Sequence, residues 1–91
     1  MKLTRKHVVV AGKVQGVGFR WSACSRANEL GLTGWVRNLS DRRVEICFQG
    51  ELGAVAEMED WCRVGPLRSR VTGISVSEDV PVDGETGFKI R

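Results

Sequence analysis

The sequence predicts a small α+β fold in which two helices cover one face of a single antiparallel sheet. Its 91 residues are enough for one domain, residues 1–91, with one modest core. Apolar residues make up 42% of the chain and charged residues 27%, which is typical of a globular protein. Runs with strand and helix periodicity follow one another as β-α-β-β-α-β, and two right-handed crossovers put both helices on the same face.

The first half of the chain supplies a strand, a glycine loop and a helix. Residues 7–14 are β-rich and bounded by glycine, which predicts a buried strand. A glycine loop follows at residues 15–20. From Trp21 to Leu30 apolar residues recur at helical spacing, and Gly31 fits the left-handed position that closes a helix.

The remaining elements are a hairpin, a second helix and two further strands. Residues 33–39 and 44–48 predict strands joined by a turn at 40–43, and residues 52–63 predict a helix closed by Gly65 and Pro66. Residues 71–80 form the fourth strand, in which Gly73 indicates a bulge, and residues 88–91 a short closing strand. The residues expected to face the core are Val44, Ile46, Phe48, Leu52, Val55, Met58, Cys62, Phe88 and Ile90.

Charge is uneven along the chain. Residues 1–45 hold nine Lys or Arg and three Asp or Glu, a net +6, whereas residues 46–91 hold five and eight, a net −3. A positive first half suits a small anion or a nucleic acid as partner. No window approaches the length of a membrane span, and the apolar run near the start is too short for a signal peptide, so we expect a cytoplasmic protein with no membrane partner.

Cysteine and histidine usage argues against a metal site. Cys24, Cys47 and Cys62 are odd in number and lack a Cys-x-x-Cys spacing, so we interpret them as small core residues. A bridge between Cys24 and Cys62 is conceivable if the two helices pack side by side. His7 alone cannot build a histidine metal cluster, and no metal is expected.

The strongest chemical signal is the glycine loop before the first helix. Gly16 and Gly18 can take positive φ and leave amides unshielded, which predicts an anion-binding nest at a helix N-terminus. Arg20 at that helix start opposes the helix dipole unless an anion lies between them, and its guanidinium grips phosphate oxygens bidentately. The alternative is a tight strand-to-helix turn with Arg20 simply exposed. The spacing matches neither a Walker loop nor a dinucleotide fingerprint.

Asn38, at the end of the second strand, is the second candidate. A carboxamide both donates and accepts, so it can hold a water molecule. Taken alone, Asn38 is interpreted as a turn residue, and the catalytic interpretation gains weight if the end of this strand lies beside the glycine loop. The chain shows no nucleophile–base arrangement, so its chemistry must depend on positioning and charge stabilisation. Phosphoryl transfer to water fits this inventory, and a carboxylate leaving group needs no general acid.

Two long segments, residues 12–20 (GKVQGVGFR) and residues 30–38 (LGLTGWVRN), resemble the two signatures of the acylphosphatases, and the similarity extends over essentially the whole chain. The resemblance implies a ferredoxin-like fold, hydrolysis of acyl phosphates to carboxylate and phosphate, and no metal or organic cofactor. It implies that Asn38 orients the attacking water. It further implies a phosphoryl site made by Gln15, Gly16, Val17, Gly18, Phe19 and Arg20. We expect a monomer that inorganic phosphate inhibits as product. Arg42 stands where the family usually has glycine, and we expect it to strain the hairpin turn or change its type.

Other readings remain at this point. An RNA-recognition module shares this length and element order, but its stacking aromatics are missing from the third strand. A catalytically inactive or carbamoyl-handling relative is a third possibility. We interpret Trp35 and Trp61 as packing residues and His7 as a surface residue, while Trp21 can flank the substrate pocket and Ser22 can cap the helix or contact phosphate.

Overall fold

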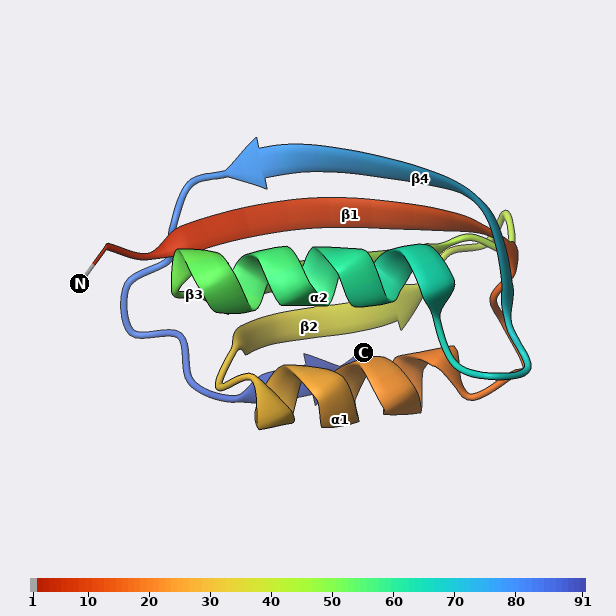
Figure 1. The fold of residues 1–91 in the computed structure, drawn as a ribbon, viewed down its shortest axis with the longest axis horizontal. Coiled ribbons are helices and arrows are strands. Elements are labelled where there is room, and N and C mark those ends of the chain that lie inside the picture. Colours follow the sequence, from red (N-terminus) through yellow and green to blue (C-terminus); the bar gives the residue numbers. More distant parts are fainter. Residues whose placement is uncertain (1) are drawn as a thin grey trace.

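A computed structural model describes residues 2–91 as a five-stranded sheet with two helices on one face (Figure 1). The predicted order of elements and the ferredoxin-like fold are confirmed. In chain order the elements are β1 (Thr4–Lys13), α1 (Phe19–Glu29), β2 (Thr33–Asn38), β3 (Val44–Gly50), α2 (Leu52–Val64), β4 (Arg70–Asp79) and β5 (Phe88–Ile90). Among residues 2–91, no helix is long and apolar enough to cross a bilayer.

The sheet is mixed rather than fully antiparallel, which corrects the prediction. Its strand order is β4-β1-β3-β2-β5, and β5 pairs parallel to β2, whereas every other pairing is antiparallel. The reason lies in the connection. β4 ends beside the start of β1, where Asp79 pairs with Arg5, and this is the end of the sheet at which β2 begins. The segment after β4 crosses the sheet at this same end, so β5 starts beside the start of β2 and runs parallel to it.

A buried polar cluster holds that crossing segment in place. Arg5, only 5% exposed, donates to both carboxylate oxygens of Glu85, at 2.8 and 3.2 Å. Gln49 exchanges two hydrogen bonds with the backbone of Val82, and the Thr33 hydroxyl donates to Glu85 at 2.8 Å. The bonds to the Glu85 carboxylate contribute about 1.5–3 kcal/mol each and the neutral bonds of Gln49 about 0.5–1.5 kcal/mol each. They fix the segment that delivers β5 to the edge of β2.

The core lies between the helices and the sheet, with Val8, Ile46 and Phe48 fully buried at its centre. Two expected core residues do not belong to it. Leu52, at the first position of α2, is 67% exposed, and Ile90 near the chain end is 44% exposed. Leu52 begins α2 and Ile90 ends β5, so each lies at the margin of the helix–sheet interface, where fewer neighbours cover an apolar side chain.

All three cysteines are free thiols, so the conceivable bridge between Cys24 and Cys62 is not formed. Cys47 and Cys62 are buried as expected, and burial raises the pKa of the Cys62 thiol well above its usual range. Cys24 is half-buried; its thiol donates to the Phe88 carbonyl at 3.6 Å.

The two backbone irregularities that the sequence suggested are both present. The register between β1 and β4 shifts at Gly12, beside Gly73, as a bulge requires. In the β2–β3 turn, Arg42 has φ 75° and is the one non-glycine residue with positive φ among residues 2–91. The three-residue loop between Leu39 and Arg43 is thus a turn that ends in a left-handed residue, a position that favours glycine.

Candidate active site

All the predicted site residues except Val17 line one cavity of about 240 Å³. The β1–α1 loop and the β2–β3 turn lie at the same end of the sheet (Figure 1). The cavity between them is lined by Val14, Gln15, Gly16, Gly18, Phe19, Arg20, Trp21, Asn38 and Ile90. Arg20 and Asn38, eighteen positions apart in the sequence, therefore face the same space.

The backbone of the glycine loop has the conformation of a nest. Gly16 (φ 73°) and Gly18 (φ 77°) are left-handed, and Val17 between them is not. Alternation of this kind turns successive amides toward one point. A Cβ built on either glycine meets no atom within 4 Å, so glycine is needed here for its positive φ and not for space.

The amides of this loop are not used by the protein itself. Within residues 2–91, none of the amides from Gln15 to Trp21 donates to another protein group, and the first bond is that from Ser22 N to Gly18 O, at 3.0 Å. Helix α1 has no side-chain cap and no acidic residue in its first turn. Its positive N-terminal end therefore adds to the unfilled donors.

Arg20, in the first turn of α1, pairs with no Asp or Glu side chain among the described residues. Its guanidinium makes one bond, from Nη1 to the Arg91 backbone oxygen, at 3.4 Å. A guanidinium has five N–H donors in a planar fork, so most of them stay available to an anion. By contrast, Arg5 and Arg37 on the open face of the sheet are both paired with glutamates.

Asn38 and Gln15 use their carboxamides differently. The Asn38 side chain makes no hydrogen bond within residues 2–91 and is half-buried at the end of β2. Gln15 donates from Nε2 to the carbonyls of Leu39 and Arg43, at 2.8 and 2.9 Å. Its side chain therefore connects the glycine loop to the hairpin and holds the two halves of the cavity together.

The side chains of two other loop residues pack against the core. Phe19 is 2% exposed, and its ring packs on that of Trp61 at 5.2 Å between centroids. Val17 packs partly against the core. The prediction missed Ile90 and the Arg91 carbonyl as cavity neighbours. A backbone carbonyl has no sequence signature, and only the parallel pairing of β5 reveals it.

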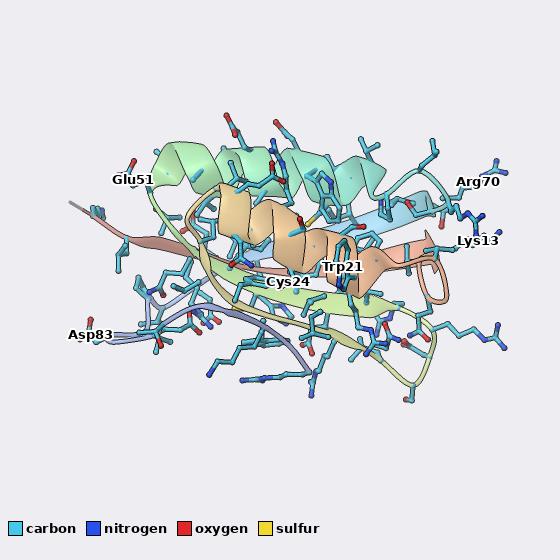
Figure 2. The ribbon with its side chains drawn as sticks, turned by 90° about the horizontal axis from the view of Figure 1, so that it is seen from below. Lys13, Trp21, Cys24, Glu51, Arg70 and Asp83 are labelled. Atoms are coloured by element: carbon cyan, nitrogen blue, oxygen red, sulfur yellow. The ribbon has the colours of Figure 1, made fainter. Side chains whose placement is uncertain are left out.

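Charge is separated along the molecule. Lys13 and Arg70, which pair across β1 and β4, lie at the end that carries the glycine loop, whereas Glu51 and Asp83 lie at the opposite end (Figure 2). Neither Lys13 nor Arg70 has a salt-bridge partner in the described part of the chain. This end therefore attracts small anions.

The open face of the sheet is occupied by its own ion pairs. His7 contacts Glu45 at 2.6 Å and Arg37 also donates to it; burial raises the pKa of Glu45, but these two bonds outweigh it and leave the pKa lowered. The guanidinium of Arg91 lies over the Trp35 ring, with its Cζ 4.5 Å from the ring centroid. The face of β3 between them carries Glu45, Cys47 and Gln49 rather than aromatic rings, which argues against the RNA-recognition alternative.

Comparison with known proteins agrees with this geometry. An acylphosphatase from Roseiflexus sp. (strain RS-1) is 49% identical over 90 residues, covering 99% of this chain and 97% of that relative. The structure of an acylphosphatase from Coxiella burnetii superposes with a TM-score of 0.92 at 42% identity, covering 98% of this chain and 93% of that one.

The same fold also occurs inside a larger protein. The crystal structure of full-length HypF in the phosphate- and nucleotide-bound form matches with a TM-score of 0.84 at 27% identity, covering 99% of this chain but 12% of that one. The family model described as Acylphosphatase matches residues 6–90. The chain belongs to the acylphosphatase family and is an acylphosphatase, a hydrolase of the carboxyl–phosphate bond.

Proposed function

We propose that this acylphosphatase holds the phosphoryl group of its substrate on the amides of residues 15–20 and the Arg20 guanidinium, while Asn38 orients the attacking water. The amides and the guanidinium neutralise the charge that develops on the equatorial oxygens. The water oxygen bonds to phosphorus as the bond from phosphorus to the acyl oxygen breaks. A carboxylate leaves, and a phosphoryl oxygen takes the proton of the water.

One observation carries this proposal. Arg20 and Asn38 line the same cavity as a run of amides that donate to no protein group within residues 2–91. Unfilled donors of this kind, with a guanidinium that no Asp or Glu side chain of the described residues neutralises, favour an anion over an empty site. A carboxylate is a good leaving group, because the pKa of its conjugate acid is about 4. The reaction therefore needs no general acid from the protein.

Two variants separate the assigned roles. Arg20→Gln should lower kcat/KM for benzoyl phosphate about 1000-fold and abolish competitive inhibition by inorganic phosphate, because it removes the charged clamp. Asn38→Ala should lower kcat about 100-fold and leave phosphate inhibition unchanged, because only the water is misplaced. Arg26→Gln on the same helix, where Arg26 lies 3.8 Å from Glu57, is the matched control and should retain activity.

Each variant has an outcome that would contradict the role assigned to its residue. An Asn38→Ala enzyme with a near-normal rate would refute the orienting role. An Arg20→Gln enzyme that phosphate still inhibits would place the phosphoryl group elsewhere. The assays are run with EDTA present.

The wider setting is also part of the proposal. We infer that residues 1–91 act as one domain and as a monomer on a small acyl phosphate, that inorganic phosphate binds as product and inhibitor, and that the protein works in the cytoplasm. Three free thiols suit a reducing compartment. Sedimentation equilibrium tests the monomer, and a rise in melting temperature with millimolar phosphate tests product binding.

A further inference from the structure

A second cavity adjoins the phosphoryl site. It measures about 270 Å³ and is lined by Trp21, Cys24, Ser25, Asn28 and Ile90. Trp21 and Ile90 line both cavities, so the two spaces meet at these side chains. Figure 2 shows Trp21 and Cys24 on the same side of α1. The second cavity is thus a groove between α1 and β5 that begins where the phosphoryl site ends.

The spacing of the helical residues gives the groove its length. Trp21, Cys24 and Asn28 recur at three- and four-residue intervals, so they line one face of α1. At 1.5 Å rise per residue, the distance from Trp21 to Asn28 is about 10 Å along the axis. The groove therefore has room for a group larger than an acetyl methyl.

The groove is uncharged, and its rim at Trp21 and Ile90 is apolar, while Ser25 and Asn28 add neutral polar groups. Trp21 is 73% exposed and Ile90 44% exposed, and both belong to its shared rim. The thiol of Cys24 is already engaged, because it donates to the Phe88 carbonyl and accepts from Asn28 Nδ2 at 3.7 Å. None of the five lining side chains carries a charge. The apolar rim stabilises an aromatic or branched neutral group, and the groove offers no charged partner to a second carboxylate.

We propose that this groove, which we call the acyl groove, binds the acyl part of the substrate and makes the enzyme selective for aromatic or bulky apolar acyl phosphates. This inference rests on the proposed function, in which the phosphoryl group occupies the glycine loop. The carboxyl carbon of the substrate lies one oxygen away from phosphorus. Its substituent therefore reaches the shared rim formed by Trp21 and Ile90.

The test compares benzoyl phosphate with acetyl phosphate in wild type, Trp21→Ala, Trp21→Phe and Leu52→Ala. Wild type should prefer benzoyl phosphate. Trp21→Ala should lower the ratio of kcat/KM for benzoyl phosphate to that for acetyl phosphate about tenfold, because the lost contact serves mainly the larger group. Trp21→Phe should restore most of the preference. Leu52→Ala, an equally exposed apolar residue on the other helix, is the control and should change neither substrate.

A binding measurement separates this proposal from the hydrolytic one. Titration calorimetry with phenylphosphonate and methylphosphonate needs no turnover. Phenylphosphonate should bind more tightly than methylphosphonate to wild type, and this difference should disappear in Trp21→Ala. That outcome supports the acyl groove even if neither acyl phosphate is hydrolysed. Absence of hydrolysis would contradict only the proposed function. Equal binding of the two phosphonates, or equal losses for both substrates in Trp21→Ala, would overturn the groove.

Discussion

Replacement of Arg42 by glycine should stabilise the protein. Arg42 is exposed, has φ 75°, and donates its amide to the Leu39 carbonyl at 3.2 Å in the β2–β3 turn. The Leu39 amide donates in turn to the Arg43 carbonyl at 2.8 Å, which closes the loop. The hydrogen bonds of this turn therefore require a positive φ at position 42, where the residue carries a Cβ.

The expected gain follows from two opposing effects. A non-glycine residue in the left-handed region costs about 1–2 kcal/mol, which the variant recovers. Glycine gains backbone freedom in the unfolded chain, which lowers the free energy of unfolding by about 0.4–1 kcal/mol. The net stabilisation is therefore about 0.5–1 kcal/mol, or about 2–8 °C in Tm for a domain of this size.

Thermal and urea unfolding of wild type, Arg42→Gly and Arg42→Ala test this reasoning. Arg42→Ala removes the same guanidinium but keeps the Cβ, so it should leave Tm within about 1 °C of wild type. Hydrolysis of benzoyl phosphate should change less than twofold in both variants, because Arg42 does not line the phosphoryl cavity. An Arg42→Gly variant no more stable than Arg42→Ala would show that the backbone conformation is not the source of strain.

Three further predictions concern packing and pH. Gln15→Ala should lower the free energy of unfolding by about 1–2 kcal/mol and weaken phosphate inhibition, because two bonds to the hairpin are lost; unchanged inhibition would contradict its positioning role. Gly34→Ala should destabilise by about 3 kcal/mol or more in urea, since its Cβ would lie 1.9 Å from a backbone oxygen, whereas Gly84→Ala, also at positive φ but in open space, should destabilise less; equal losses would contradict the clash. Burial raises the pKa of Glu45 and Glu85, but their hydrogen bonds outweigh it and lower both pKa values, so their contribution is present above the unfolded pKa of about 4.5 and is lost as pH falls through the folded values. Unfolding free energy measured from pH 6 to pH 3 should decline below about pH 4.5, and less steeply in Glu85→Gln; identical slopes would contradict this assignment.

Local signals were sufficient for most of the fold. Alternation in residues 44–48 and the glycine at position 31 act over a few residues, and the structure has the strand there and Gly31 at φ 70°. Helix α1 begins at Phe19, two residues before the predicted start at Trp21. The apolar periodicity that predicts the helix becomes visible only from Trp21. The start of β1 at Thr4 was missed because its charged residues, Arg5 and Lys6, are neutralised by partners far away in the sequence, Glu85 and Glu59. Arg5 is buried there by its bonds to Glu85, 80 positions away.

The parallel direction of β5 could not be read from its three residues. It depends on where β4 ends and on the long-range contacts that hold residues 80–87 across the sheet. For the same reason the candidate site was incomplete. The glycine loop and Asn38 belong to motifs and were predicted, whereas Ile90 and the Arg91 carbonyl reach the cavity only through that topology.

The most direct test of the central proposal is an amide NMR titration of the ¹⁵N-labelled protein with inorganic phosphate. The account predicts saturable shifts in the backbone amides of residues 15–20 and in the Arg20 Nε–H, with the Asn38 carboxamide responding at the same dissociation constant. The resonances of Glu51 and Asp83, at the acidic end of the molecule, should not move. Saturation that leaves the amides of the glycine loop unchanged while other amides shift would contradict the account.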